Sequence, residues 1–220
     1  MSLDTASRRA YGDLPDQFAD ERGPDASTLV LHGGFWRARY SLDLMDAFCI
    51  DLADRGISTW NAEYRRVGAG GGYPQTLADI AAACRAFRPK VAVGHSAGGH
   101  LALWAAAEGF VDRAVSLGGV CDLVAAAEDR LGNGAVFDFL GGPPSAHPDA
   151  DPAQRLPLAA RVLLIHGSED DTVPVEHPRR FAEQSGCELV ELEGAGHFDV
   201  IEPHSAFWPR VADAIERFGE

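Results

Sequence analysis

The chain has 220 residues, of which 46% are hydrophobic and 24% charged, so it can bury one core and is expected to fold as a single domain over residues 1–220. Its formal net charge of −14, with the basic residues scattered among acids, argues against a nucleic-acid partner. No run of about 18 apolar residues occurs and the first thirty residues are too charged for a signal-peptide core, so the sequence predicts a cytoplasmic protein with no membrane partner.

Short apolar runs recur along the chain and alternate with segments of helical pattern. Strands are expected at 28–33, 57–64, 91–96, 114–119, 161–167 and 187–194, and helices at 42–56, 76–87, 99–109 and 178–186. Such alternation builds a mostly parallel central sheet with helices on both faces, which is the α/β class.

One long segment, residues 121–160, falls outside this rhythm and is rich in glycine and proline. A long insertion in a compact domain is often functional, so this segment is a candidate for a short lid. It carries Phe137 and Phe139, which are expected to line a substrate pocket.

Polar residues follow the ends of several predicted strands, where an open parallel sheet gathers its ligand chemistry. Ser96, an acid at Asp170 or Asp171, and His197 come from three such ends and are expected to converge. The stretch Gly94 to Gly98 has the G-x-S-x-G pattern of a nucleophile elbow, in which the serine occupies a strained strand-to-helix turn. In that geometry the N–H of Ala97 becomes one donor of an oxyanion hole.

Four motifs in this order resemble those of the α/β-hydrolases, and within them the branch of bacterial esterases and kynurenine formamidase-like enzymes. They are HGGFW at 32–36, GHSAGGHLALW at 94–104, HGSEDDTVP at 166–174 and GAGHF at 194–198. The resemblance implies an α/β-hydrolase fold. The chain departs from the family in two ways, because the region before Thr28 is short for two full edge strands and no large cap domain is expected.

The resemblance also assigns the remaining site residues. The family's spacing places the catalytic acid at Asp170 rather than Asp171, which would then be a turn or capping residue. Gly34 and Phe35 would donate the other oxyanion N–H groups, by family pattern. Apart from the resemblance, Trp36 fits a pocket wall and core packing equally well, and Asp79 is similarly ambiguous, with a helix-surface acid favoured over a site residue.

The other histidines are expected to be structural or exposed. His32, His95, His100 and His166 stand beside strand ends and should bond to the backbone, while loops are expected to hold His147, His177 and His204. None has the spacing of a metal motif, and the four cysteines have no C-x-x-C pair, so the sequence predicts free thiols, no metal and no cofactor.

These residues together predict a serine hydrolase that cleaves a small-acyl carboxylic ester through an acyl-enzyme, and the partner expected is a small-molecule ester or amide substrate. One alternative is an amide hydrolase resembling kynurenine formamidase or an aminopeptidase. An alternative of another class is a non-catalytic protein that keeps the α/β-hydrolase fold and binds ligands in its cleft. The oligomeric state is left open.

Overall fold

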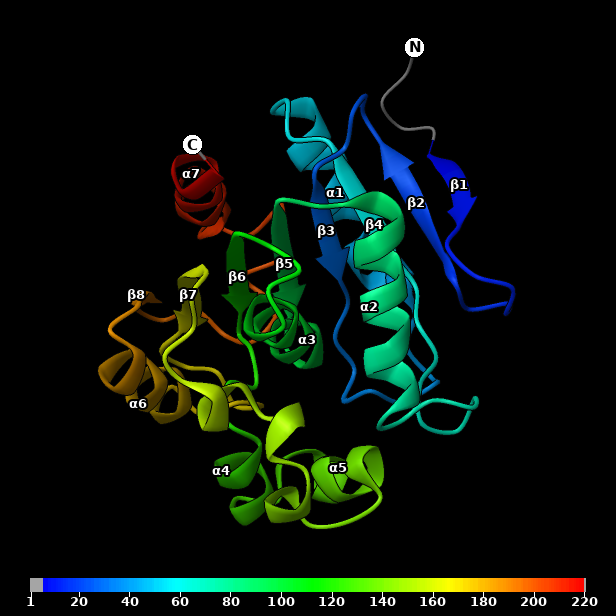
Figure 1. Cartoon of the computed structure of the whole chain (residues 1–220). Coiled ribbons are helices and arrows are strands. Elements are labelled where there is room, and N and C mark those ends of the chain that lie inside the picture. The colour runs from blue at the N-terminus through cyan, green and yellow to red at the C-terminus, as the bar shows by residue number, and fades with distance from the viewer. Residues whose placement is uncertain (1–5, 220) are drawn as a thin grey trace.

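One eight-stranded sheet runs through the computed structural model, which describes residues 6–219 (Figure 1). The order across the sheet is β1-β2-β4-β3-β5-β6-β7-β8. The pairs β1–β2 and β2–β4 are antiparallel and all the others are parallel. The strands are β1 Ser7–Ala10, β2 Phe18–Arg22, β3 Thr28–Leu31, β4 Thr59–Ala62, β5 Val91–His95, β6 Arg113–Leu117, β7 Arg161–Gly167 and β8 Glu188–Leu192.

All six predicted strands are confirmed, within a residue or two at their ends. The N-terminal edge is short, as expected, but it holds two strands that the apolar pattern did not reveal. In β1 every residue is exposed, and Arg8 forms two hydrogen bonds of 2.8 and 2.9 Å with Asp20 of β2. The two strands pair as an antiparallel ladder and carry charged side chains that bond across it, so this edge lacks a hydrophobic signature.

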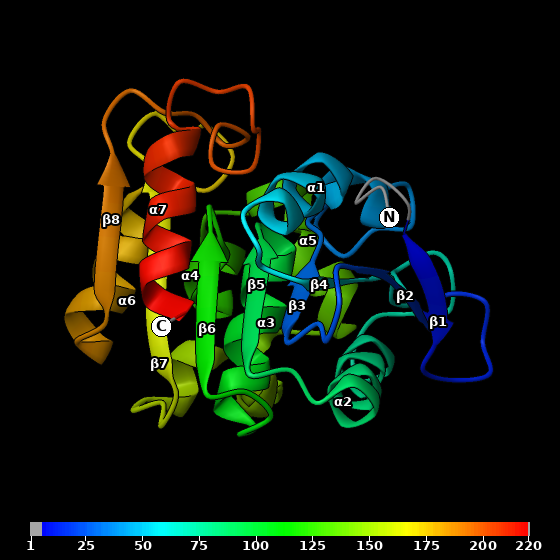
Figure 2. The same ribbon diagram turned by 90° about the horizontal axis from the view of Figure 1, so that it is seen from above.

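Helices cover both faces of the sheet (Figure 2). On one face of the sheet, side chains of α1 and α7 form a hydrophobic cluster with side chains of β3, β5, β6 and β7. On the opposite face, side chains of α2, α3 and α6 contribute to a second hydrophobic cluster. No helix of residues 6–219 is long and apolar enough to cross a membrane. These helices are α1 Asp46–Asp54, α2 Gln75–Phe87, α3 Ala97–Ala107, α6 Glu176–Ser185 and α7 Trp208–Gly219. A 3₁₀ turn, η1 Leu42–Met45, precedes α1.

The expectation that Asp79 is a surface acid is wrong. Asp79 lies on α2 but is fully buried, and its carboxylate accepts three hydrogen bonds from Arg65 at 2.7 to 2.9 Å. The paired arginine offsets the free-energy cost of burying this carboxylate, because its N–H groups replace the hydrogen bonds to water that the carboxylate loses.

The segment 121–160 is helical and lies at the carboxyl edge of the sheet (Figure 1). Its inner side chains, among them Val136 and Phe139, belong to the main core cluster. The segment is therefore packed in place, and a lid movement stays a prediction. It consists of α4 Leu123–Glu128, α5 Leu131–Leu140 and the 3₁₀ turns η2 Pro144–Ala146, η3 Pro148–Ala150 and η4 Pro152–Arg155.

Candidate active site

Ser96 is the single residue between the end of β5 and the start of α3, and it lies in a sharp turn. Its backbone angles, φ 54° and ψ −117°, lie in a region that L-residues rarely adopt. The flanking glycines make this turn possible, since a Cβ at Gly94 would overlap the carbonyl oxygen of Gly98, and one at Gly98 would overlap that of Leu31. The turn places Ser96 at the N-terminus of α3, where backbone N–H groups and the helix dipole favour negative charge.

His197 and Asp170 form a hydrogen-bonded pair at the same edge. His197 Nδ1 lies 2.7 Å from Asp170 Oδ2, and both side chains are almost fully buried. Asp170 Oδ1 accepts the backbone N–H groups of Thr172 at 2.9 Å and Val173 at 2.8 Å, which fixes the carboxylate plane. The neighbouring Asp171 is exposed, and among residues 6–219 its side chain bonds only to the hydroxyl of Thr172.

The Asp170 carboxylate is held in its charged form. Burial raises the pKa of Asp170, but the hydrogen bond and charge of His197 and the N–H of Val173 outweigh it, so the pKa lies below its ordinary value. A carboxylate that stays ionised can orient the His197 ring and stabilise it when it gains a proton.

Ser96 and His197 line one cavity of about 190 Å³. Within residues 6–219 no hydrogen bond joins Ser96 Oγ to the His197 ring in this state. Such bonds are often long without substrate and tighten in the reacting complex.

The HGGFW loop lies directly against Ser96. A Cβ at Gly33 would be 2.9 Å from Cβ of Ser96, so only glycine allows this approach. Positive φ angles follow at Gly34, 103°, and Phe35, 52°. In the described residues no hydrogen bond uses the N–H of Gly34, Phe35 or Ala97, which leaves all three available as donors.

A buried polar network behind this loop holds it in place. Glu63 Oε1 lies 2.9 Å from His32 Nε2 and 2.6 Å from an Arg66 nitrogen, and its other oxygen accepts the N–H of Leu42. The Tyr64 hydroxyl donates to the His32 carbonyl at 2.7 Å. Sequence patterns did not reveal this network, because only His32 lies in one of the four motifs and its partners Glu63 and Tyr64 follow about thirty residues later.

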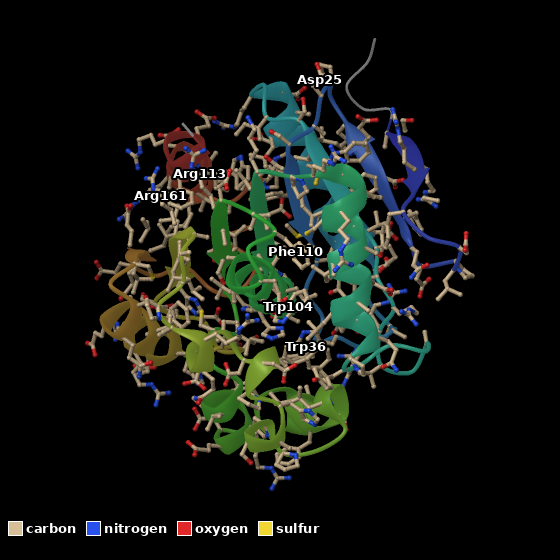
Figure 3. The ribbon with its side chains drawn as sticks, in the orientation of Figure 1. Asp25, Trp36, Trp104, Phe110, Arg113 and Arg161 are labelled. Carbon is tan, nitrogen blue, oxygen red and sulfur yellow. The ribbon has the colours of Figure 1, made fainter. Side chains whose placement is uncertain are left out.

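The pocket residues expected from the sequence lie elsewhere. Trp36 and Phe139 are fully buried and stack on each other with ring centroids 4.6 Å apart, so they pack the core. Figure 3 shows Trp36 in the interior, between α3 and α5. Phe137 faces solvent on the outside of α5, 48% exposed, because Val136 and Phe139 occupy the inward face of that helix.

Other side chains form the cavity wall instead. Phe35 lines it as part of the HGGFW loop, and Phe198 stands beside His197, 56% exposed. The wall also contains residues that the sequence analysis did not select, namely Arg39, Tyr40, Leu44 and Thr172. Phe198 and Thr172 lie inside the GAGHF and HGSEDDTVP motifs, and Arg39 and Tyr40 follow HGGFW closely, so their positions in the chain could have pointed to them.

The remaining histidines mostly bond to the backbone, as predicted. His95, His100 and His166 donate through Nε2 to carbonyl oxygens at 2.8 to 3.0 Å, and burial, together with the nearby His197, lowers the pKa of His95 to about 3. The prediction that His177 lies in an exposed loop is wrong. His177 is buried on α6 and bonds to Asp129 near the end of α4, which ties the two helices together.

Nothing in the described range forms a group of three or more His, Cys, Asp or Glu side chains that could hold a metal ion. The four cysteines of this range are free thiols.

The sharp G-x-S-x-G turn at the carboxyl edge of a mostly parallel sheet, with helices on both faces, is typical of the α/β-hydrolase fold. In the part of the chain that the structure describes, no large cap domain covers this edge. The family model for serine hydrolases matches residues 74–217, so the chain belongs to the serine hydrolase family.

Esterase LipC of Mycobacterium tuberculosis is 29% identical over an alignment of 243 positions, and the alignment covers 89% of this chain and 60% of that protein. The chain therefore spans about 60% of the length of this curated relative.

Solved structures share the fold. Thermogutta terrifontis esterase 2, phosphoramylated by tabun, superposes with a TM-score of 0.80 at 24% identity, over 98% of this chain and 94% of that one. A truncated carbohydrate esterase from gut microbiota gives a TM-score of 0.80 at 18% identity, over 99% and 95% of the two chains.

Proposed function

We propose that this serine hydrolase is a carboxylesterase that cleaves small-acyl esters, with Ser96 as nucleophile, His197 as general base and Asp170 as the acid that orients it. The observation that carries the proposal is the 2.7 Å hydrogen bond between Asp170 and His197, because the His197 side chain lines the same cavity as the strained Ser96. The curated relative, itself named an esterase, supports ester over amide as the substrate.

The reaction follows from these positions. Ser96 Oγ attacks the ester carbonyl carbon while His197 Nε2 accepts the hydroxyl proton, and Asp170 stabilises the imidazolium. His197 then returns that proton to the leaving alcohol, which leaves an acyl group on Ser96. Water hydrolyses the acyl-enzyme by the same route and releases the carboxylic acid.

The N–H groups of Gly34, Phe35 and Ala97 are the proposed oxyanion hole. Each well-aimed donor contributes roughly 3–4 kcal/mol of transition-state stabilisation. The network of Glu63 and His32 keeps the loop in one conformation before substrate arrives, so the donors need little reorganisation during the reaction.

Cavity size supports a short acyl group. A volume of about 190 Å³ is below the roughly 300–1,000 Å³ of pockets that hold drug-sized ligands. A long acyl chain would extend past Phe198 into solvent and gain little from burial.

A fluorophosphonate probe tests the nucleophile directly. We expect one probe molecule per chain, mapped by peptide mass spectrometry to Ser96, and no labelling of Ser96→Ala. Ser145→Ala, which removes an exposed hydroxyl on η2, is the matched control and should label like the wild type. Labelling that persists in Ser96→Ala would contradict the proposal, and an unlabelled wild type would favour a binding protein over an enzyme.

A further inference from the structure

One cationic side chain, Arg39, stands in the wall of the cavity that holds Ser96 and His197. Arg39 is exposed and forms no ion pair within residues 6–219. Its neighbour Arg37 behaves differently, because it pairs with Asp138 of α5 at 3.0 Å and does not line the cavity. A free arginine at a reaction site is notable in a chain of net charge −14.

Contacts with Tyr40 hold the Arg39 guanidinium in position. One of its nitrogens donates to the Tyr40 hydroxyl at 2.6 Å, and its central carbon lies 4.6 Å from the centre of the Tyr40 ring. The Tyr40 ring in turn occupies the space where a side chain at Gly34 would stand, directly on the oxyanion loop. Arg39 is thereby linked through Tyr40 to the loop that receives the substrate carbonyl.

The guanidinium keeps most of its hydrogen-bonding capacity for a ligand. It has five N–H donors, and only the bond to Tyr40 is made within the described residues. Two parallel N–H groups of a guanidinium match the two oxygens of a carboxylate, which is the geometry that arginine favours.

Among the described residues, no carboxylate lines the cavity wall to compete for this charge. Asp170 stands behind His197, and its oxygens are already bonded to His197, Thr172 and Val173. His95 is neutral at physiological pH, since burial lowers its pKa to about 3. The cavity therefore offers a positive charge to an incoming substrate, and low-dielectric walls strengthen its field.

We propose that Arg39 is the carboxylate-binding residue of this site, so that the preferred esters carry a carboxylate close to the scissile bond. This inference rests on the proposed esterase function and names the substrate class of the same site. The carboxylate can belong to the acyl group or to the leaving alcohol, and the two sources are separated by experiment.

Two pairs of esters provide the test. In the acyl pair, 4-nitrophenyl glutarate carries a carboxylate and 4-nitrophenyl 5-oxohexanoate is its neutral counterpart. In the alcohol pair, 4-acetoxybenzoate is compared with 4-acetoxybenzamide. The measured quantity is the ratio of kcat/KM for the anionic ester to that for the neutral ester, corrected for spontaneous hydrolysis.

We expect this ratio to exceed one in at least one pair and to fall by about three- to tenfold in Arg39→Gln, the range for a partly exposed charge-assisted contact. Arg39→Lys should keep part of the preference because it keeps the charge without the planar fork. Arg37→Gln removes one positive charge from the same loop outside the cavity, and its ratio should stay within about twofold of wild type.

The outcomes are distinguishable. A wild type that hydrolyses both members of each pair with equal kcat/KM, or an unchanged ratio in Arg39→Gln, overturns the carboxylate site and leaves the esterase proposal standing. A wild type that hydrolyses none of the four esters and does not label at Ser96 overturns both.

Discussion

Replacement of Asp170 by asparagine separates the proposed role of this residue from its structural one. The asparagine carbonyl can replace Oδ1 and still accept the N–H groups of Thr172 and Val173, so the loop should keep its shape. The new amide NH₂ would then face His197 Nδ1 at the position of Oδ2, which lies 2.7 Å away in the wild type. A donor there forces Nδ1 to act as acceptor and places the ring proton on Nε2. That nitrogen can then no longer accept the proton of Ser96.

The expected loss in kcat is large because the wrong tautomer dominates. We expect a fall of about 10⁴-fold at neutral pH, the loss typical of this substitution in a serine triad. This corresponds to about 5 kcal/mol of lost transition-state stabilisation. Initial rates of 4-nitrophenyl acetate hydrolysis measure it, and a urea unfolding curve of each variant checks that the fold is intact.

Asp171→Asn is the matched control, since Asp171 is exposed and its carboxylate accepts the Thr172 hydroxyl. Its kcat should stay within about twofold of wild type. Equal losses in the two variants, or a larger loss in Asp171→Asn, would refute the assignment of Asp170 as the orienting acid.

Two further predictions concern the pocket and the buried histidines. Because the cavity is small, kcat/KM for neutral 4-nitrophenyl esters should peak at about two to four acyl carbons and fall steeply by about eight. Each methylene that stays unburied forfeits about 0.8 kcal/mol of binding free energy. A preference for octanoate would disprove this prediction, and rapid cleavage of an N-formyl arylamide would favour an amide hydrolase. The pKa of His95 is about 3 in the folded chain and about 6.5 in the unfolded chain. Between these pH values the unfolded chain binds more protons, so the free energy of unfolding falls as the pH drops through this window. Between pH 8 and pH 5 the wild type should therefore lose about 2 kcal/mol more unfolding free energy than His95→Gln, by urea titration. The exposed His204→Gln should follow the wild type, and parallel curves for all three proteins would contradict the neutral buried state.

The central strands and the residues at their ends could be predicted from the sequence because both depend on local patterns. Buried parallel strands read as apolar runs, and the glycines around Ser96 are required by backbone contacts that a Cβ would obstruct. The order of strand ends then indicated which serine, acid and histidine should meet.

Features that depend on distant partners could not be predicted in this way. Asp79 looks like a surface acid until Arg65, fourteen residues earlier, is placed beside it. The helix α5 was hidden because Gly132 and Gly134, which suggest a loop, do adopt left-handed angles at its start. Similarly, the choice between pocket and core for Trp36 depends on Phe139, a residue more than a hundred positions away.

The left-handed backbone of Ser96 has a consequence for the stability of the whole chain. A side chain in such a conformation costs about 1–3 kcal/mol, a sizeable share of the roughly 5–15 kcal/mol that keeps a domain folded. Glycine would adopt these angles without strain but would supply no hydroxyl. With Ser96 as the proposed nucleophile, the residue that best fits this backbone is not the one that the proposed reaction needs, so selection for stability would oppose selection for turnover at this position. Gains in thermal tolerance have to come from positions far from the turn, such as the exposed strand β1.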